Sequence, residues 1–519
     1  MTQQHNANEL PQYPQSYWLA SASLPGFSAL QEDIQTDVAV VGAGMTGIAA
    51  AYLLAEQGVK VTLLDAGRIL NGTTGHTTAK ITAQHDLIYD ELIAHLGQEQ
   101  AKLYYEANTE ALQWIGSMVS KHGISCGYTE EDAYVYTASK ESEAKIIKEF
   151  EAYEKLGIPG SYVQQTQLPL PVIGAVVMNK QAQFHPLAFL SALVEQLTRK
   201  GVRIYEHTEA MTVEEDGNGR QTVVTSRGHK IHCGHVLSCT HFPFYGARGL
   251  YFAKLHAERS YVLAVKTGEG VRKPKGMYLS AEDPKRSIRT VRINGEELLL
   301  LGGENHQTGQ GLCTIRYYEA LQSFGQQYFD IQNIAYRWSA QDLISLDKLP
   351  YIGPATENTH RVLVATGYKK WGMTTSIAAA QLLSKQVTGQ KSPYAELFRP
   401  SRFHADPSLR NLVVEGADVA KHFVKGKLEM PMHSPDELGN DEGGVVRLNG
   451  KRAGAYRDPQ GKLHLVDTTC THMGCEVEWN AGERSWDCPC HGSRFSYQGE
   501  VLEGPAKRPL EAVKETAKV

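Results

Sequence analysis

Apolar runs and helical patterns follow one another in a regular order near the start of this chain. Residues 37–41 are almost entirely apolar and predict a buried strand. Residues 48–57 are small and apolar and predict a helix, and residues 59–64 predict a second strand. Strand, helix and strand in this order predict a doubly wound α/β domain with a parallel sheet.

Further periodic segments extend this pattern to about residue 400. Helical periodicity predicts two helices within residues 86–122 and one helix in each of the segments 141–156 and 187–199. Residues 222–239 predict a hairpin or strand pair. Residues 250–302 alternate as antiparallel strands do, and we expect them to form a β-rich substrate domain inserted at about 245–330.

The turn after the first strand carries a dinucleotide-binding pattern. Gly42, Gly44 and Gly47 have the spacing G-x-G-x-x-G, which permits a tight turn and a close approach of a pyrophosphate to the helix N-terminus. Asp65 follows the second strand, where a carboxylate can accept both hydroxyls of an adenosine ribose. The glycines, the two strands and the acid together predict a bound dinucleotide.

Two more segments favour a flavin over a nicotinamide cofactor. Residues 67–80 form a run of glycines and hydroxyls that includes Thr74 and His76, and such a run offers donors to a cofactor. A second small-residue helix at residues 377–383 follows the segment 366–376, where a helix N-terminus can stabilise negative charge on a reduced flavin. The candidate cofactor-binding residues of this second segment are Gly367, Gly372, Met373 and Thr374.

Composition narrows the functional classes. Lys and Arg number 52 against 57 Asp and Glu, a net charge of −5, and no basic run is present, so nucleic acid is not expected as a partner. The N-terminus lacks a signal-peptide pattern and no apolar stretch is long enough to span a membrane, so we expect a cytoplasmic protein. Residues 1–34 are polar and proline-marked and predict an arm with Tyr17, Trp18 and Leu19 as anchors.

Metal-ligand spacing marks the C-terminal part. Residues 401–433 are charged, polar and proline-containing and predict a linker with a short helix around 417–425, followed by an all-β domain at 434–519. Four of the eight cysteines lie between positions 470 and 490. Cys470-x-His472, fifteen residues, then Cys488-x-x-His491 resembles the ligand pattern of Rieske proteins.

The Rieske resemblance implies a [2Fe-2S] cluster with one iron on Cys470 and Cys488 and the other on His472 and His491. It also implies a disulfide between Cys475 and Cys490 and a hydrogen bond from Ser493 to a cluster sulfur. Residues 504–505 would form a third loop that covers the cluster. Phe495 stands where respiratory Rieske proteins have a tyrosine, so we expect a potential below the top of the Rieske range.

Residues 16 to about 400 resemble the D-amino-acid-oxidase-like flavoprotein superfamily. The resemblance rests on the G-x-G-x-x-G run, Asp65, residues 72–80, residues 302–304 and residues 365–374. It implies FAD held by two discontinuous segments and a substrate that is oxidised by hydride transfer to the flavin. His76 lies where some family members carry a histidine covalently joined to the flavin; a noncovalent hydrogen bond or no contact are the alternatives.

The substrate side has three candidate catalytic residues, Arg259, His306 and Lys370, of which an arginine is suited to a carboxylate. The fold could bring each of them to the flavin, and each could equally be an exposed charge. Histidines and cysteines at positions 229–241 are also dense, but strand side chains alternate between faces, so we do not predict a metal site there.

Together these features predict an FAD-dependent domain at 35–400 fused to a Rieske domain. We expect a dehydrogenase that oxidises a small amine, amino acid or hydroxy acid and passes electrons singly through the cluster to an external protein or quinone. Two alternatives stay open: a reductase with the reverse electron flow, and a redox or iron sensor. A Rieske-type oxygenase is disfavoured because no Asp-x-x-His…His run for a mononuclear iron is present.

Overall fold

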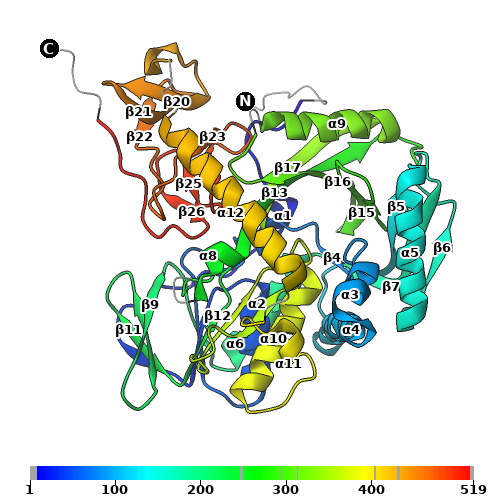
Figure 1. Ribbon diagram of the computed structural model, residues 1–519, viewed down its shortest axis with the longest axis horizontal. Coiled ribbons are helices and arrows are strands. Elements are labelled where there is room, and N and C mark those ends of the chain that lie inside the picture. Colours follow the sequence, from blue (N-terminus) through cyan, green and yellow to red (C-terminus); the bar gives the residue numbers. More distant parts are fainter. Residues whose placement is uncertain are drawn as a thin grey trace.

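The computed structural model describes residues 9–245, 249–293, 295–311, 314–402, 405–428 and 433–514. Within these residues a large domain (9–402) contains three sheets and a C-terminal domain (433–514) contains two. Helix α12 (Ala405–Leu428) joins them and runs diagonally across the molecule in Figure 1. It occupies most of the segment predicted as a linker, and it is much longer than the short helix that we expected there.

A mainly parallel sheet of six strands forms the centre of the large domain, in the order β18-β19-β12-β2-β3-β8. Only β18 runs antiparallel to its neighbour. The strands are β2 (Val38–Val41), β3 (Val61–Leu64), β8 (Arg203–Tyr205), β12 (His235–Ser238), β18 (Tyr351–Pro354) and β19 (Val362–Thr366). Its main helices are α2 (Met45–Glu56), α6 (Pro186–Arg199) and α10 (Gly372–Val387). The predicted doubly wound core is therefore confirmed, although α2 and α10 begin earlier than expected.

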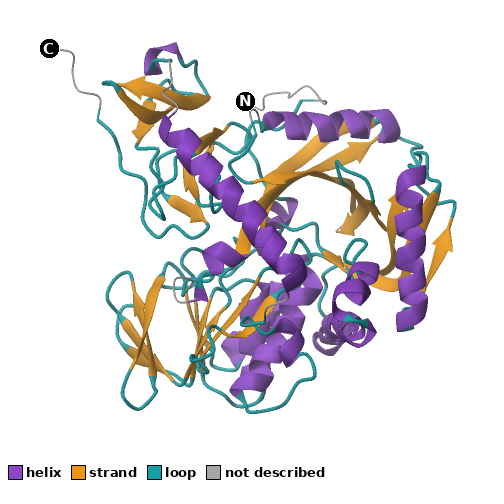
Figure 2. Cartoon of the chain, viewed as in Figure 1, coloured by secondary structure: helices purple, strands orange, loops and turns teal. Residues whose placement is uncertain are grey.

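A second, nine-stranded sheet curves beside the first in Figure 2. Its order is β17-β13-β16-β15-β14-β5-β7-β4, with β6 paired to β7, and all its pairs are antiparallel except β14 with β5. Its strands are β4 (Lys80–Ile81), β5 (Thr129–Thr137), β6 (Gly160–Val163), β7 (Gly174–Gln183), β13 (Leu255–Thr267), β14 (Met277–Ser280), β15 (Arg286–Ile293), β16 (Glu296–Gln307) and β17 (Ile331–Ser345).

This sheet corrects the predicted insertion at about 245–330. Strands β4 to β7 come from residues 80–183 and β17 extends past residue 330, so two distant segments build the sheet together. The helices beside it are α3 (Tyr89–Leu96), α4 (Gln98–His122), α5 (Lys140–Leu156) and α9 (Ile315–Phe329). The helix pair within 86–122 and the helix at 141–156 match their predictions, whereas α9 was not predicted.

A smaller sheet holds the predicted strand pair. Strands β10 (Gln221–Thr225) and β11 (Lys230–Cys233) are antiparallel neighbours, with β1 (Ile34–Gln35) and β9 (Ala210–Glu215) outside them. Strand β12 lies in the six-stranded sheet instead. The histidine- and cysteine-rich segment 229–241 is thus divided between two sheets.

The N-terminal arm is anchored by the aromatic residues predicted for that role. In α1 (Tyr17–Ser21), Tyr17 and Trp18 are buried, and Trp18 Nε1 donates to the Thr77 carbonyl over 2.7 Å. The Ser16 hydroxyl donates to the Gly75 carbonyl. The arm therefore holds η1 (Thr73–His76), the segment predicted to contact the flavin.

Short strands make up the C-terminal domain. One sheet contains β20 (Glu442–Leu448), β21 (Lys451–Arg457) and β22 (Leu463–Val466), and the other contains β23 (Glu478–Asn480), β24 (Ser485–Asp487), β25 (Arg494–Ser496) and β26 (Val501–Glu503). Within the described residues the remaining short helices are α8 (Tyr251–Lys254), α11 (Ala395–Phe398) and η2 (Pro435–Glu437). Among the described residues, no helix has the length and apolar character needed to cross a membrane.

Candidate cofactor sites

Two of the three glycines of the first turn, Gly42 and Gly47, are required by their surroundings. A Cβ on Gly47 would lie 1.9 Å from the Gly42 carbonyl oxygen, so only glycine lets α2 pack this closely on the turn. Gly42 has φ +101°, a conformation that glycine adopts readily. A Cβ on Gly44 would lie 3.1 Å from the Thr74 hydroxyl. The turn is therefore bare backbone beside η1, which suits a pyrophosphate.

Asp65 lies at the carboxyl end of β3 as predicted. Its two carboxylate oxygens accept from the backbone N–H groups of Ala43 and Gly67, each over 2.9 Å. Burial raises the pKa of Asp65, and these two hydrogen bonds oppose that effect. The carboxylate is thus fixed beside the glycine turn, where a dinucleotide ribose is expected.

The η1 segment meets the glycine turn directly. The Thr74 hydroxyl accepts from the Met45 N–H in the first turn of α2 over 3.2 Å. His76 is held by Nδ1 against the Gly72 carbonyl at 2.9 Å, and its own carbonyl accepts from Trp338 Nε1 over 2.8 Å. Burial lowers the pKa of His76, so its imidazole is neutral near pH 7.

The second predicted segment is brought to the first. The Tyr368 hydroxyl lies 2.9 Å from the Thr46 hydroxyl in α2. Gly367 has φ +77°, and α10 begins at Gly372, with Met373 and Thr374 buried in its first turn. The Thr374 hydroxyl donates to the Thr82 carbonyl over 3.0 Å, so it supports the segment after η1.

Neither α2 nor α10 has a side-chain cap at its N-terminus. Helix N-termini carry partial positive charge and unpaired N–H groups, which suit the phosphates and the reduced ring of a flavin. Together with the glycine turn and Asp65, the donors present fit FAD. We propose that these two segments hold it.

The four predicted cluster ligands converge in the C-terminal domain. Cys470 and Cys488 are buried free thiols, and their mutual contact lowers the pKa of Cys470 to about 7 and raises that of Cys488, so the contact favours a thiolate at Cys470. The rings of His472 and His491 lie 5.0 Å apart. Burial lowers the pKa of both histidines, that of His491 to about 4, which leaves neutral imidazoles.

Both histidines have one ring nitrogen without a partner. Within the described residues, the buried Nδ1 atoms of His472 and His491 have no hydrogen-bond partner. Two orphaned imidazole nitrogens and two buried thiols, one of each from either loop, are the donor set of a Rieske cluster, so the residues fit the group. We propose these four side chains as its ligands.

The surrounding loops also match the resemblance. Cys475 and Cys490 form a disulfide, and the sulfurs of both lie within 4.8 Å of the Cys488 sulfur. The Ser493 hydroxyl lies against Cys470 and accepts from the Ala506 N–H over 3.1 Å. The segment at 504–506 therefore covers the ligand loops, as predicted for the third loop.

All three cluster loops pack against the large domain. Phe252 in α8 has its ring 6.1 Å from the His472 ring and 5.8 Å from the His491 ring. The Gly492 carbonyl accepts from Gln341 Nε2 over 2.9 Å. Lys507, just after the third loop, donates to two carbonyls of the large domain, over 2.6 and 2.9 Å. The histidine side of the candidate cluster thus faces the large domain.

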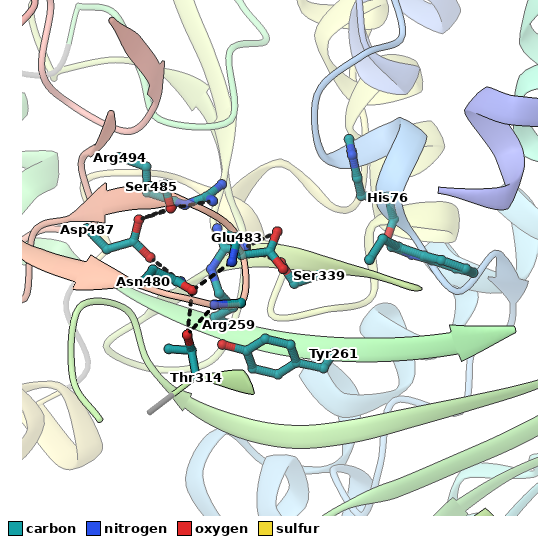
Figure 3. Close-up of polar contacts among 12 residues, drawn as sticks. His76, Arg259, Tyr261, Thr314, Ser339, Asn480, Glu483, Ser485, Asp487 and Arg494 are labelled. Atoms are coloured by element: carbon teal, nitrogen blue, oxygen red, sulfur yellow. Dashed lines mark hydrogen bonds and ion pairs between the residues drawn. The ribbon is translucent and has the colours of Figure 1, made fainter. Parts of the chain in front are cut away.

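Arg259 has a different environment from the one predicted. It lies in β13, is 1% exposed, and forms an ion pair with Glu483 of the C-terminal domain at 3.9 Å (Figure 3). A second ion pair joins it to Glu503 of the same domain at 3.6 Å. Two acids already engage its charge. We therefore reassign Arg259 from substrate binding to the contact between the domains.

The other two candidates have partners of their own. His306 lies opposite Arg259 in β16 and stacks on Tyr317, with ring centroids 4.4 Å apart. Lys370 pairs with Glu258 at 2.6 Å. A catalytic role for either residue stays a prediction.

Sequence reasoning missed two cations beside the candidate flavin segments. Arg289 in β15 is 1% exposed, and among the described residues its Nε and Nη2 have no hydrogen-bond partner, while Nη1 donates to Gln183 over 2.6 Å. Lys80, four residues after His76, has Nζ 5.8 Å from the Trp371 ring that precedes α10. Burial lowers the pKa of Lys80 to about 7, and Arg289 adds to the effect. In the sequence both look like ordinary strand residues.

Comparison with known proteins agrees with this geometry. Residues 37–386 match the family model described as FAD dependent oxidoreductase, and residues 429–514 match the Rieske [2Fe-2S] domain. The putative Rieske 2Fe-2S iron-sulfur protein YhfW of Bacillus subtilis (strain 168) is 50% identical over 99% of both chains.

Two relatives of the large domain are more distant. The gamma-glutamylputrescine oxidoreductase of Escherichia coli (strain K12) is 22% identical over 73% of this chain and 90% of its own. The crystal structure of glycine oxidase from Geobacillus kaustophilus, 17% identical, covers 71% of this chain and 99% of its own with a TM-score of 0.61, which shows the shared fold. The chain belongs to the FAD dependent oxidoreductase family and carries a C-terminal Rieske [2Fe-2S] domain.

Proposed function

We propose that this protein is a dehydrogenase that oxidises a small amino acid, or a related amine or hydroxy acid, and delivers the electrons through its Rieske cluster to an external acceptor. One observation carries the proposal. The candidate cluster histidines face the large domain, with Phe252 against both rings, and the loops around them are hydrogen-bonded to that domain. A cluster held in this way is placed to exchange electrons inside the chain.

Electron counting supports a dehydrogenase. Oxidation of an amine to an imine releases two electrons and two protons, which FAD accepts together when bound. A [2Fe-2S] centre carries one electron, so each turnover needs two successive one-electron transfers through it to an external acceptor such as a protein or a quinone. An oxidase that reduces oxygen directly has no need of the second cofactor.

The two cations Arg289 and Lys80 support an amino acid as substrate. The free Nε and Nη2 of Arg289 suit a carboxylate, which binds arginine through two parallel hydrogen bonds. Lys80 lies near enough to Arg289 for their charges to interact, and with a pKa of about 7 its amine can accept a proton from a substrate ammonium. The names of two similar proteins, glycine oxidase and gamma-glutamylputrescine oxidoreductase, point to the same donor class.

An anaerobic titration with amino acids, matched amines without the carboxylate, and hydroxy acids tests the proposal. We expect an amino acid to bleach the flavin absorbance and an EPR signal of the reduced cluster to follow. Arg289→Gln should raise the substrate concentration needed for half-maximal bleaching by tenfold or more (about 1.4 kcal/mol). Arg292→Gln is the control, because Arg292 lies in the same strand but is half exposed and paired with Glu297.

If no compound in the panel bleaches the flavin and a ferredoxin rapidly reduces the cluster, the result would instead favour the reverse electron flow.

A further inference from the structure

The contact between the domains contains a buried group of charges (Figure 3). Arg259 of the large domain is enclosed there, with Nη1 also bonded to the Ser339 hydroxyl, and its two acidic neighbours come from the C-terminal domain. Glu483 is in turn held by the Tyr318 hydroxyl, which donates over 2.7 Å. Glu503 accepts from the Thr73 hydroxyl of η1 at 3.4 Å. This charge group therefore reaches from the candidate flavin segment to the C-terminal domain.

The acids of this group lie next to the cluster loops in the chain. Asp487 directly precedes the ligand Cys488, and its carboxylate accepts from Arg494 Nε over 3.1 Å. Glu503 directly precedes Gly504, where a Cβ would lie 2.7 Å from the Ser493 Cα. Arg494 also pairs with Glu503 at 3.4 Å.

The charges of the two domains complement each other at this point. In the C-terminal domain, the carboxylates of Glu483, Asp487 and Glu503 outnumber the guanidinium of Arg494, their described cationic partner on that side. The large domain supplies a second cation, Arg259. Because the site is buried, water screens these charges weakly and they act strongly on nearby groups.

We propose that Arg259 is a positioning residue that sets the reduction potential of the cluster from the neighbouring domain. Reduction adds one negative charge to the cluster, so a buried cation nearby favours the reduced form and raises the potential. Glu503 has the opposite effect, since its carboxylate opposes added negative charge. Docking of the two domains thus directs electrons from the flavin towards the iron.

The direction of flow rests on the proposed function, whereas the effect on the potential does not. An EPR-monitored redox titration of the full-length protein with both cofactors bound measures that potential without any substrate. We expect Arg259→Gln to lower it by at least about 59 mV, a tenfold change in the one-electron equilibrium. Arg259→Lys should restore most of the loss, and Glu503→Gln should raise the potential.

Arg337→Gln is the matched control. Arg337 is an equally buried arginine at the same contact, but it donates to backbone carbonyls, Gly482 among them over 2.8 Å, instead of pairing with the acids. Its loss disturbs the contact without removing a partner of Glu503, so the potential should shift clearly less than in Arg259→Gln.

Opposite shifts for Arg259→Gln and Glu503→Gln support the proposal, because mere loosening of the contact would move both in the same direction. Shifts of the same sign, no shift in either variant, or an equal shift in Arg337→Gln would overturn it. If Arg259→Gln loses its cluster, the reduction potentials of Arg259→Lys and Glu503→Gln are compared instead. They should again shift in opposite directions, downwards for Arg259→Lys and upwards for Glu503→Gln. A wild-type protein whose flavin no substrate reduces would refute the proposed function and leave this result standing.

Discussion

The ring of Phe252 lies 5.8 Å from the ring of His491, so a side chain of the large domain covers a candidate ligand of the iron–sulfur cluster. His472 is covered by the same ring. In this arrangement the histidine side of the cluster is occupied by its own chain. We therefore propose that an external electron acceptor approaches from another side and that the flavin is the direct exchange partner.

Gly309 of the large domain lies in close contact with the ligand loop at Cys488 and Pro489. A small substitution at Gly309 should therefore move the cluster away from the flavin. Gly309 has φ +75°, and a Cβ there would lie 2.4 Å from the Pro489 nitrogen and 2.6 Å from the Cys488 carbonyl carbon. Gly309→Ala should displace the ligand loop and slow electron transfer from flavin to cluster by about tenfold or more, with the iron content unchanged. Rapid-mixing absorbance spectroscopy measures the rate. In the control Gly270→Ala, φ is +86° but the space is open, and an equal loss of rate there would refute the explanation.

The ligand set predicts a selective loss of cofactor. His491→Ala removes one of two imidazoles from the cluster, so the protein should purify with FAD and without the EPR signal of a Rieske centre. His464→Ala should keep both, because His464 pairs with Asp458 at 2.9 Å and is no candidate ligand. Iron analysis and EPR check both variants. A normal Rieske signal in His491→Ala would show that the ligands are assigned incorrectly.

The position of Asp65 implies that this residue strengthens FAD binding. Its carboxylate fixes the glycine turn through two backbone N–H groups and is placed for the ribose hydroxyls. Asp65→Ala should weaken FAD binding by about 1.5–3 kcal/mol, which is the usual contribution of a hydrogen bond to a charged group. Fluorescence titration of the apoprotein with FAD measures the affinity. Asp216→Ala, in an exposed turn between β9 and β10, should change nothing; equal affinities of both variants would contradict the role of Asp65.

Lys80 predicts a pH dependence. Burial lowers its pKa from 10.5 to about 7, so the amine loses its proton as the pH rises through about 7. If the neutral amine accepts the substrate proton, flavin reduction should accelerate across this range and then level off. Lys80→Met should slow the reaction by about 10²–10⁴-fold and abolish the rise. Stopped-flow bleaching at several pH values measures this, and a rise that persists in Lys80→Met would assign it to another group.

The same lysine affects stability with a definite sign. Between pH 7 and 10.5 the unfolded chain binds more protons at Lys80 than the folded chain does. Stability therefore increases with pH through this window, and Lys80→Met should flatten the increase. Denaturant unfolding of wild type and variant at pH 7 and pH 9 measures the difference.

Local patterns in the sequence were sufficient for the central features of the fold. The G-x-G-x-x-G turn, Asp65 and the four cluster ligands depend on short spacings, and the structure brings each group together. Family resemblance supplied the disulfide partners, which the structure also joins. Such features can be predicted because neighbouring residues determine them.

Features that depend on distant contacts could not be predicted. In the nine-stranded sheet β5 pairs with β14, which lies more than one hundred residues later in the chain. No local sequence pattern predicts that pairing. Arg259 was a candidate substrate-binding residue because an arginine suits a carboxylate. Its acidic partners, however, lie more than two hundred residues later in the chain. Helix α12 was predicted as a linker because its charged and proline-containing sequence resembles one, and its contacts with both domains stabilise the helix instead.

The most direct test of the account is the concentration dependence of electron transfer between the two cofactors. A laser flash with a one-electron photoreductant delivers an electron to the bound flavin, and absorbance at the flavin and cluster bands follows its path. We predict oxidation of the flavin and reduction of the cluster at one shared rate that is independent of protein concentration, because both centres belong to one docked chain. A rate proportional to protein concentration, or a cluster that stays oxidised, would contradict the account.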